Sequence, residues 1–542
     1  MGRKNVARPN RPRTKFAELK KLPFRALLLT VVLTMGFCSR PPRNAGRELK
    51  PKLLDLRLVY FTSPRNLIPY LGRIYIEGQL TDLIFNNLVR ANYAGILAPE
   101  LAESWEISPD RKIYTFHLRP NVFFHNGQPL TADDVIFTLE RLILDTRSPH
   151  WAVNTIAGSS DFVSGRTTKV AGLKKIGPHT LKIELTQSFK YFLEFLSGEY
   201  AAILPENFAG KATDDFNENP IGTGPYRFSG RTLKTVKDTQ FSVFHFLKNK
   251  SYFEPAGNVD HIDFYFFDGD ISSEAKLYFD IVFISNKDIQ AISASPGYNI
   301  INTSYNALFF LILNPQENSD LKQRKIRQLI QYGINREKLV STIFNHQAIP
   351  AHSLIPFGLL GQNPGYRIDS RKAVQLRSEL GDKPVSFTLV SAARLQNDRV
   401  LAYLQDDLKR FSVNLTVETV SDPVQFFNQT IYQTKSSLLV GGIPDYPAAY
   451  NFLSNLAETE GLFNIFHVPF PESTARVHQL PSLDIVGETR DLEWVNRQLE
   501  EDAVYIPLYY YSDLIAVNTY IKKINFKYGQ IIDFSRMEVI DE

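Results

Sequence analysis

The feature that most constrains the fold of this 542-residue sequence is a strand–helix–strand pattern between residues 384 and 441. Apolar side chains alternate along 385–389 and along 413–417, as in half-buried strands, whereas those of 400–408 follow helical spacing. A further apolar strand occupies 436–442. Two strands separated by a helix pair in parallel through a right-handed crossover. At least part of the chain is therefore expected to have an α/β fold.

The last of these strands runs directly into a loop that contains Asp445. In open α/β sheets, ligands lie beyond the carboxyl ends of the strands, so Asp445 is a carboxylate where such a fold presents charge to a ligand. Two other interpretations are open. Asp445 caps a helix that Pro447 begins, or it is a solvated loop carboxylate. The strand pattern by itself favours these two over a ligand contact.

Two local signals upstream predict a hairpin and a helix. Residues 113–127 alternate apolar with polar side chains at 114–118 and contain the turn pair Asn126-Gly127, which together predict a hairpin. Thr131 and Asp134 have the spacing of a capping box at a helix start. Carboxylates in a first helical turn complement the helix dipole, so the acidic pair at 133–134 needs no catalytic role.

The first 37 residues are expected to be a signal peptide. They carry nine Lys and Arg against one acid, and they end in the apolar run 26–37. Twelve apolar residues fall short of the roughly 20 that span a bilayer, but they suit the core of a signal peptide. A retained short anchor and a buried helix are the alternatives.

Cys38 directly follows the apolar run, which suggests a lipid-modified N-terminus. The residue before such a cysteine is normally small, whereas here it is Phe37, so an unmodified Cys38 is the alternative. Residues 38–52 are rich in Pro and Arg and are expected to form a tether.

Charge and motifs exclude several functional classes. The net charge of +4 arises from the leader, because residues 38–542 contain 52 basic and 56 acidic residues. This mildly acidic body gives no electrostatic case for nucleic-acid binding. The sequence has no phosphate-binding loop, HExxH or GxSxG motif, a single cysteine and ten scattered histidines. We therefore expect no enzyme, no resident metal and no cofactor.

A long stretch, Thr81–Leu142, resembles the signature region of a known family, the bacterial extracellular solute-binding proteins of family 5. These are the oligopeptide-, dipeptide- and nickel-binding components of ABC importers. The matching motifs occur in the family's order along 55–542: PELAESWE (99–106), FHNG (124–127), PLTADDV (129–135), NPIGTGPYRF (219–228), KNKSYF (248–253), RKIRQLIQYGINREKLV (324–340) and YIPLYYY (505–511).

The resemblance implies a type II periplasmic-binding-protein fold of cluster C, with two α/β lobes joined by two crossing strands and an extra domain in the N-terminal half. Mapped onto this sequence, lobe I comprises 53–80, 215–304 and 508–542, the extra domain 81–214, and lobe II 305–507. The glycines of the GTGPY motif, Gly222 and Gly224, are expected to free the backbone in a turn.

The resemblance also implies a ligand site. In peptide-binding relatives an Asp after this strand pairs with the α-ammonium of the ligand, and the loop 441–452 resembles that loop, which places Asp445 on that residue. A charge-assisted pair of this kind selects ligands with a free N-terminus. With the resemblance, a ligand contact becomes the favoured interpretation of Asp445, in place of a helix cap or a solvated loop carboxylate. The backbone of Gly441, Gly442 and Ile443 would hydrogen-bond an extended peptide as an added strand.

Three departures from the family pattern concern the ligand class more than the fold. Many relatives read DYPDP in this loop, whereas here Ala448 replaces the second acid. Pro444 supplies no N–H, so one ligand hydrogen bond is absent. Asn335 replaces the usual Asp before Arg336, which exchanges one helix cap for another.

The resemblance therefore implies a periplasmic, monomeric receptor, which a lipid on Cys38 would anchor to the membrane. It would capture short peptides between its lobes by hinge closure and deliver them to the permease subunits of an ABC transporter in the inner membrane. A metal chelate, haem or another small nutrient is the rival cargo. A surface sensor or adhesin that has lost transport is the rival of a different class.

Overall fold

The computed structural model describes residues 55–540, with gaps at 73, 146–150, 286, 304–306, 345–346, 363–368, 370, 394, 423–424 and 445. The predicted signal peptide, the tether, Cys38 and Asp445 all lie outside the described residues. Contacts divide the chain into units 1–50 and 51–542, and the description below concerns the second. No helix among the described residues combines the length and apolar character needed to cross a membrane.

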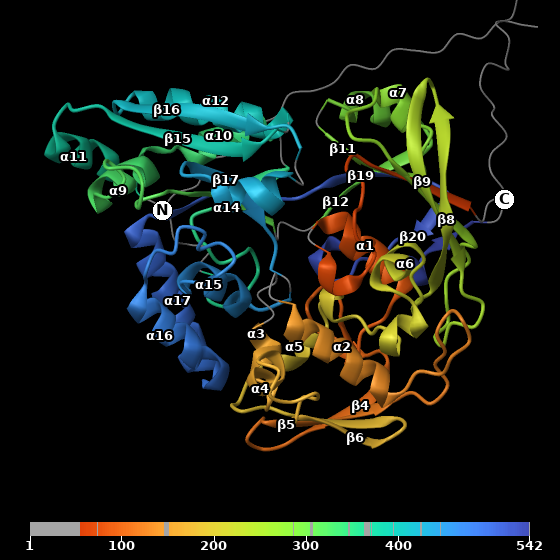
Figure 1. Cartoon of the computed structure of the whole chain (residues 1–542). Coiled ribbons are helices and arrows are strands. Elements are labelled where there is room, and N and C mark those ends of the chain that lie inside the picture. Colours follow the sequence, from red (N-terminus) through yellow and green to blue (C-terminus); the bar gives the residue numbers. More distant parts are fainter. Residues whose placement is uncertain are drawn as a thin grey trace, which may run out of the picture. The chain divides into compact units, whose positions relative to one another are not determined.

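One large sheet has seven strands in the order β12-β19-β11-β1-β10-β9-β8 (Figure 1). It is built from distant parts of the sequence: β1 (Asp55–Tyr60), β8 (Tyr226–Val236), β9 (Thr239–Lys248), β10 (His261–Phe266), β11 (Ile281–Ile284), β12 (Tyr298–Asn302) and β19 (Leu514–Asn518). β1 lies in parallel between β10 and β11, while the outer strands pair antiparallel. The carboxyl end of β1 therefore lies in the middle of the sheet.

The second large sheet has six strands in the order β14-β18-β13-β17-β15-β16. Its strands are β13 (Ala307–Ile312), β14 (Ala348–Pro350), β15 (Val385–Ala392), β16 (Val413–Val420), β17 (Ser437–Gly442) and β18 (Tyr505–Tyr511). β15 pairs in parallel with both β16 and β17, and α12 (Leu395–Lys409) connects β15 to β16. The predicted strand–helix–strand unit is confirmed.

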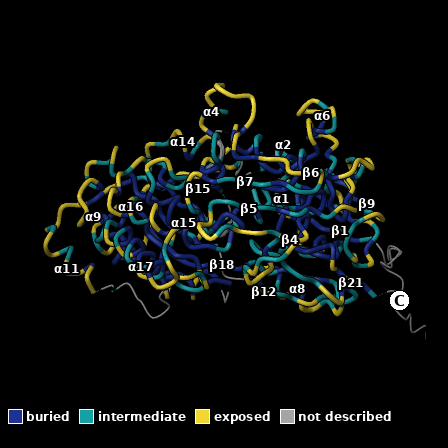
Figure 2. The backbone as a smooth tube through the Cα atoms, turned by 90° about the horizontal axis from the view of Figure 1, so that it is seen from below, coloured by how far each residue is buried: buried dark blue, intermediate teal, exposed yellow. Residues whose placement is uncertain are grey.

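Helices cover both faces of the six-stranded sheet because its strands alternate their apolar side chains. In β13, Leu308 and Phe310 belong to one buried cluster and Leu311 to another. The first cluster includes α15 (Ala449–Ala457) and α17 (Ile485–Asp502), and the second includes α9 (Arg324–Gly333), α10 (Arg336–Ile343) and α12. The strands of the sheet are accordingly mostly buried, whereas the helix α11 (Arg371–Leu380) is mostly exposed (Figure 2).

Two chain segments connect the large sheets. Thr303 follows β12 on the way to β13, and Ser512-Asp513 leads from β18 to β19. The two connections are hydrogen-bonded to each other: Thr303 N donates to Asp513 O (3.0 Å), and Asp513 N donates to Thr303 Oγ1 (2.9 Å). Two large sheets joined by two crossing segments agree with the predicted fold class, in which two α/β lobes are joined by two crossing strands.

A third sheet, of four strands, has the order β4-β5-β7-β6. Its strands are β4 (Ala102–Ile107), β5 (Ile113–Leu118), β6 (Leu173–Gly177) and β7 (Thr180–Glu184). The predicted hairpin around Asn126-Gly127 is wrong, because β5 pairs with β4 and β7 instead. Pro120 follows β5 and has no N–H to continue a ladder, so Asn126-Gly127 closes only a short loop with one bridge, between Phe123 and Pro129.

The predicted helix starts are confirmed. α2 (Ala132–Leu144) begins after Thr131, whose backbone N–H donates to Asp134 Oδ2 at 2.7 Å. α10 begins after Asn335, whose Oδ1 accepts from Lys338 N at 2.9 Å. In both places a side-chain oxygen satisfies a backbone donor at the start of the helix.

The GTGPY glycines pack against the carboxyl end of α1 (Tyr75–Ile84). A Cβ on Gly222 would lie 1.9 Å from Ile84 O, and one on Gly224 would lie 2.4 Å from Leu83 O. Neither glycine has a positive φ. The expectation that they free the backbone is therefore wrong, and glycine is required here because the backbone of α1 approaches too closely for any side chain.

Candidate ligand-binding cleft

A cleft of about 690 Å³ lies between the carboxyl ends of β1 and β17. Residues 59–62 line it from the seven-stranded sheet, and residues 439–444 line it from the six-stranded sheet. It is also lined by Ser197, Glu199, Tyr200, Lys527, Tyr528, Gly529 and Ile531. This volume is typical of small-ligand sites, and both strands present to it the end at which α/β sheets bind ligands.

The structure places the predicted residues Gly441, Gly442 and Ile443 in the lining of this cleft. β17 pairs with β13 up to Leu308↔Gly442, but its register with β15 consists of Leu389↔Ser437 and Val390↔Leu438. Beyond Leu438 the register with β15 ends: Leu439 O accepts from Ser391 Oγ of β15 at 3.4 Å, and residues 439–444 line the cleft. A strand edge without a neighbour presents backbone donors and acceptors to an extended ligand.

Both glycines of β17 also have a packing role. A Cβ on Gly441 would lie 2.8 Å from the Phe309 ring, and a Cβ on Gly442 would lie 2.6 Å from the Phe463 ring. Phe309 and Phe463 themselves line the cleft. The glycines therefore let two aromatic rings close over this strand, in addition to exposing its backbone.

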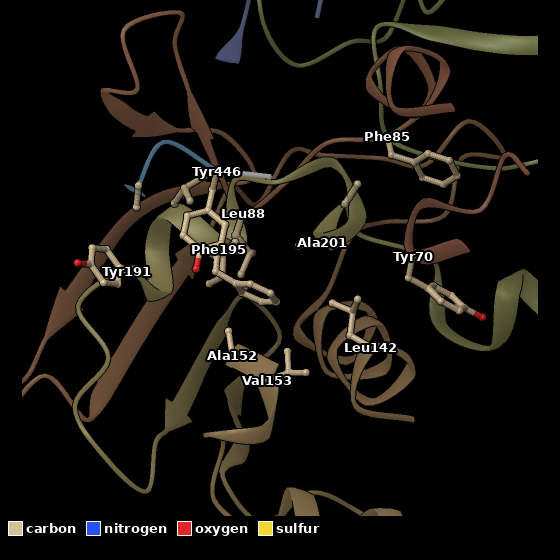
Figure 3. Packing of buried hydrophobic residues seen from close by; sticks show 14 of the residues in the cluster. Tyr70, Phe85, Leu88, Leu142, Ala152, Val153, Tyr191, Phe195, Ala201 and Tyr446 are labelled. Atoms are coloured by element: carbon tan, nitrogen blue, oxygen red, sulfur yellow. The ribbon is translucent and has the colours of Figure 1, made fainter. Parts of the chain in front are cut away.

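The loop after β17 is anchored by Tyr446, which is buried and packs edge-on against Phe195 with ring centroids 6.5 Å apart (Figure 3). The following helix α15 starts at Ala449, and its N-cap residue is Ala448, which makes no side-chain cap hydrogen bond. Pro447 therefore does not begin a helix, so the alternative of a cap for a helix starting there is wrong.

A buried ion cluster forms part of the cleft wall. Lys527 Nζ lies 2.5 Å from Asp82 Oδ1 and 3.9 Å from Glu100 Oε1. Burial raises the pKa of Asp82 to about 6, although Lys527 opposes this shift. Burial acts to lower the pKa of Lys527, but the charges of Asp82 and Glu100 outweigh it and hold that pKa above its usual value. The other cation of the wall, Arg90, bonds to Glu254 at 2.6 Å.

Aromatic rings line the same wall. The ring of Tyr60, at the end of β1, lies 5.2 Å from that of Phe283 and 6.5 Å from that of Tyr75, centroid to centroid. Sequence reasoning missed these residues. The rule that led to Asp445 could have identified Tyr60, because it also ends a parallel strand. Nothing in the local sequence marks Tyr75 or Lys527, which long-range folding brings to the cleft.

Outside the cleft, residues before α5 (Phe192–Leu196) contact α17 and α15. Lys190 Nζ donates to Glu488 Oε2 at 2.7 Å and to Leu483 O at 2.9 Å. The Tyr191 hydroxyl also donates to Glu488, and its ring stacks on Tyr450 at 4.8 Å. This contact ties the chain next to the four-stranded sheet to the helices of the six-stranded sheet.

In the described part of the chain, no three His, Asp or Glu side chains converge as a ligand set for a metal. What the cleft offers is backbone groups along one strand, aromatic faces and several carboxylates. This chemistry suits reversible binding of an organic ligand.

Comparison with known proteins identifies the family of the sequence. A sequence model of the bacterial extracellular solute-binding proteins, family 5 Middle, matches residues 97–464. The dipeptide-binding protein of Escherichia coli K12 is 27% identical over 351 residues, which are 60% of this chain and 63% of that protein. The match thus spans less than two thirds of that relative. The periplasmic oligopeptide-binding protein OppA of Salmonella typhimurium LT2 is 23% identical over 532 residues, 93% of this chain and 95% of that protein.

Solved structures share the fold. The murein tripeptide binding protein MppA of Escherichia coli superposes with a TM-score of 0.78 at 19% identity, covering 90% of this chain and 98% of that chain. The periplasmic binding protein DppA of Helicobacter pylori, in complex with the peptide STSA, superposes with a TM-score of 0.76 at 19% identity and the same coverage.

Proposed function

The chain belongs to the bacterial extracellular solute-binding proteins of family 5, and from this premise we propose that it captures short peptides and delivers them to the permease of an ABC importer. The observation that carries the proposal is the edge of β17. Beyond Leu439, whose carbonyl oxygen accepts from Ser391 Oγ, β17 has no register with β15, and residues 440–444 line a cleft of about 690 Å³ that both large sheets line. An extended peptide can add to such an edge as a further strand, through backbone contacts that ignore side-chain identity.

Binding is proposed to use backbone and charge together. Gly441, Gly442 and Ile443 would hydrogen-bond the peptide backbone, and Asp445 would pair with its α-ammonium group. Pro444 offers no N–H, so the ligand receives one backbone donor fewer from this loop. The relatives named above as dipeptide- and oligopeptide-binding proteins support this assignment.

Hinge closure would couple binding to delivery. The two crossing segments meet at Thr303 and Asp513, which bond to each other through their backbones. A few φ/ψ changes in such a short pair of connections can rotate one sheet against the other. A ligand that touches both walls of the cleft stabilises the closed state, which the permease would recognise. No covalent step is involved.

We propose domain boundaries that differ at one point from those expected from the sequence. Lobe I would comprise 53–80, 215–304 and 512–542, the extra domain 81–214, and lobe II 305–511. The last boundary moves from 508 to 512 because β18 pairs within the six-stranded sheet up to Tyr511.

Export and anchoring belong to the same proposal. Residues 1–37 would direct secretion, 38–52 would form the tether, and an acylated Cys38 would hold the receptor at the membrane as a monomer. Mass spectrometry of the mature N-terminus tests this directly: a chain that begins at Cys38 with the added mass of acyl chains supports anchoring, and an unmodified cysteine contradicts it.

Native mass spectrometry of the purified chain, followed by denaturation and identification of the released molecules, tests the function. A family of copurified peptides is the expected result, and it would give their lengths directly. A single chelate, haem or other non-peptide mass would retain the receptor but overturn the cargo. An empty cleft that takes up no added peptide would favour a surface sensor or adhesin.

A further inference from the structure

An aromatic ring lies over each of the two glycines at the end of β17. Gly441 lies directly opposite Phe309 in the register of β17 with β13. The Phe309 ring lies 2.8 Å from the place that a Cβ on Gly441 would take, and the Phe463 ring lies 2.6 Å from that of Gly442. Both rings line the cleft and are half-buried. Because the glycines have no side chains, a strand that pairs with this edge of β17 can approach both rings.

The two rings lie on opposite faces of the six-stranded sheet. Successive residues of a strand point to opposite faces, so Gly441 and Gly442 open one face each. The packing of the rings agrees with this geometry. Phe309 packs against the buried cluster that includes α9, α10 and α12, whereas Phe463 packs against the cluster that includes α15 and α17. Each face of the end of β17 therefore carries one aromatic ring.

Buried aromatic neighbours hold both rings in place. Phe309 stacks on Tyr509, with ring centroids 4.9 Å apart and an angle of 12° between the ring planes. Phe463 meets Phe310 edge-on at 5.3 Å and lies 5.3 Å from Phe452. These three neighbours are buried. A ring that is already fixed binds a ligand side chain without the entropic cost of being ordered during binding.

Aromatic rings also reach the cleft from the side of the seven-stranded sheet. Phe283 of β11 and Tyr75 of α1 line the cleft and are half-buried, with ring centroids 6.1 Å apart. A ligand side chain held between the large sheets can thus meet aromatic surface from both. An apolar side chain gains by leaving water for such a surface, whereas an amide side chain loses its hydration and finds no hydrogen-bond partner on a Phe ring.

We propose that Phe309 and Phe463 form two side-chain subsites, so that the receptor selects peptides with two adjacent apolar residues. A peptide strand added to the edge of β17 would also point its successive side chains to opposite faces. The ligand residue next to Gly441 would therefore contact Phe309, and the ligand residue next to Gly442 would contact Phe463. The inference rests on the proposed function and specifies its ligand class.

Isothermal titration of the purified full chain, after removal of copurified ligand, tests the selectivity. The probes are Ala-Ala-Ala, the three tripeptides with one Ala replaced by Leu, and the three with one Ala replaced by Asn, which has a similar size and shape. At two adjacent positions, the Leu peptide is expected to bind about tenfold more tightly than the matching Asn peptide. Phe309→Ala should reduce this ratio severalfold at one of the two positions, and Phe463→Ala at the other.

Phe123→Ala is the matched control, because it removes an aromatic ring that is 45% exposed and does not line the cleft. It should leave the Leu-to-Asn ratios unchanged. Thermal unfolding shows whether the variants fold, and Phe309→His or Phe463→His, which keeps a ring but makes it polar, replaces an Ala variant that does not. Fewer than two adjacent positions with the preference, or ratios that both cleft variants leave unchanged, would overturn the selectivity alone. If Ala-Ala-Ala and all six other peptides fail to bind, the proposed function fails and the inference with it.

Discussion

The imidazole of His125 is held between two glycines of a distant loop: its Nε2 lies 3.0 Å from Gly224 O, and its Nδ1 accepts from Gly222 N at 3.3 Å. A carbonyl oxygen can only accept, so Nε2 carries the proton and the ring is neutral. The FHNG and GTGPY motifs, about 100 residues apart in the sequence, thus form one structural unit. A second proton on this ring would remove the acceptor that Gly222 needs.

Stability should therefore fall in mild acid. Burial lowers the pKa of His125 to about 4 in the folded chain, against 6.5 for an ordinary histidine. Below pH 6.5 the unfolded chain binds a proton that the folded chain does not, so this contribution to stability is present above pH 6.5 and is lost as the pH falls toward 4. The loss amounts to at most about 3 kcal/mol.

Urea unfolding at pH 7.5 and pH 4.5 measures the effect. His125→Gln should be less stable than the natural chain at pH 7.5, and the difference should shrink at pH 4.5. His117→Gln is the control, since that side chain is 38% exposed. A constant difference between His125→Gln and the natural chain at both pH values would contradict the assignment.

Gly222→Ala should destabilise the fold by about 3 kcal/mol or more, because the added Cβ would overlap Ile84 O and the backbone of α1 cannot yield as a side chain can. Gly177→Ala is the matched control, since a Cβ there meets nothing within 4 Å. Urea unfolding of the two variants measures the effect, and the midpoint of Gly222→Ala should be the lower one. A Gly222→Ala chain as stable as Gly177→Ala would show that the loop can move away from α1.

The parts of the fold that the sequence predicts are those that local physics determines. Alternation and helical spacing predict the β15–α12–β16 unit, and capping residues predict where α2 and α10 begin. The hairpin prediction failed because β5 takes its partners from 102–107 and 180–184, and pairing with 180–184 has no local signal. The same distinction holds for the lining of the cleft. The strand pattern predicts Gly441 as a lining residue, whereas Tyr75, Glu199 and Lys527 come together in the cleft only through tertiary packing.

Asp445→Ala should weaken peptide binding by about 1.5–3 kcal/mol, the magnitude of a charged hydrogen bond. Isothermal titration with Ala-Ala-Ala and its N-acetylated form measures it. The natural chain should discriminate strongly against the acetylated peptide, and the variant should bind both weakly and alike. Asp133→Ala removes a half-exposed carboxylate elsewhere and should change neither affinity. An Asp445→Ala chain that binds Ala-Ala-Ala as the natural chain does would exclude this role for Asp445.

The Lys190–Glu488 pair should behave as a buried ion pair whose partners depend on each other. Their side chains are only 11% and 9% exposed, and Glu488 also accepts from the Tyr191 hydroxyl. Removing one partner leaves the other charge buried without compensation, so Lys190→Met should cost about 3–5 kcal/mol. Lys190→Met combined with Glu488→Gln should cost less than the sum of the single changes, because the second change removes the stranded carboxylate. Urea unfolding of the two single variants and the double variant measures the coupling. Strict additivity would show that the pair contributes nothing to holding these two parts of the chain together.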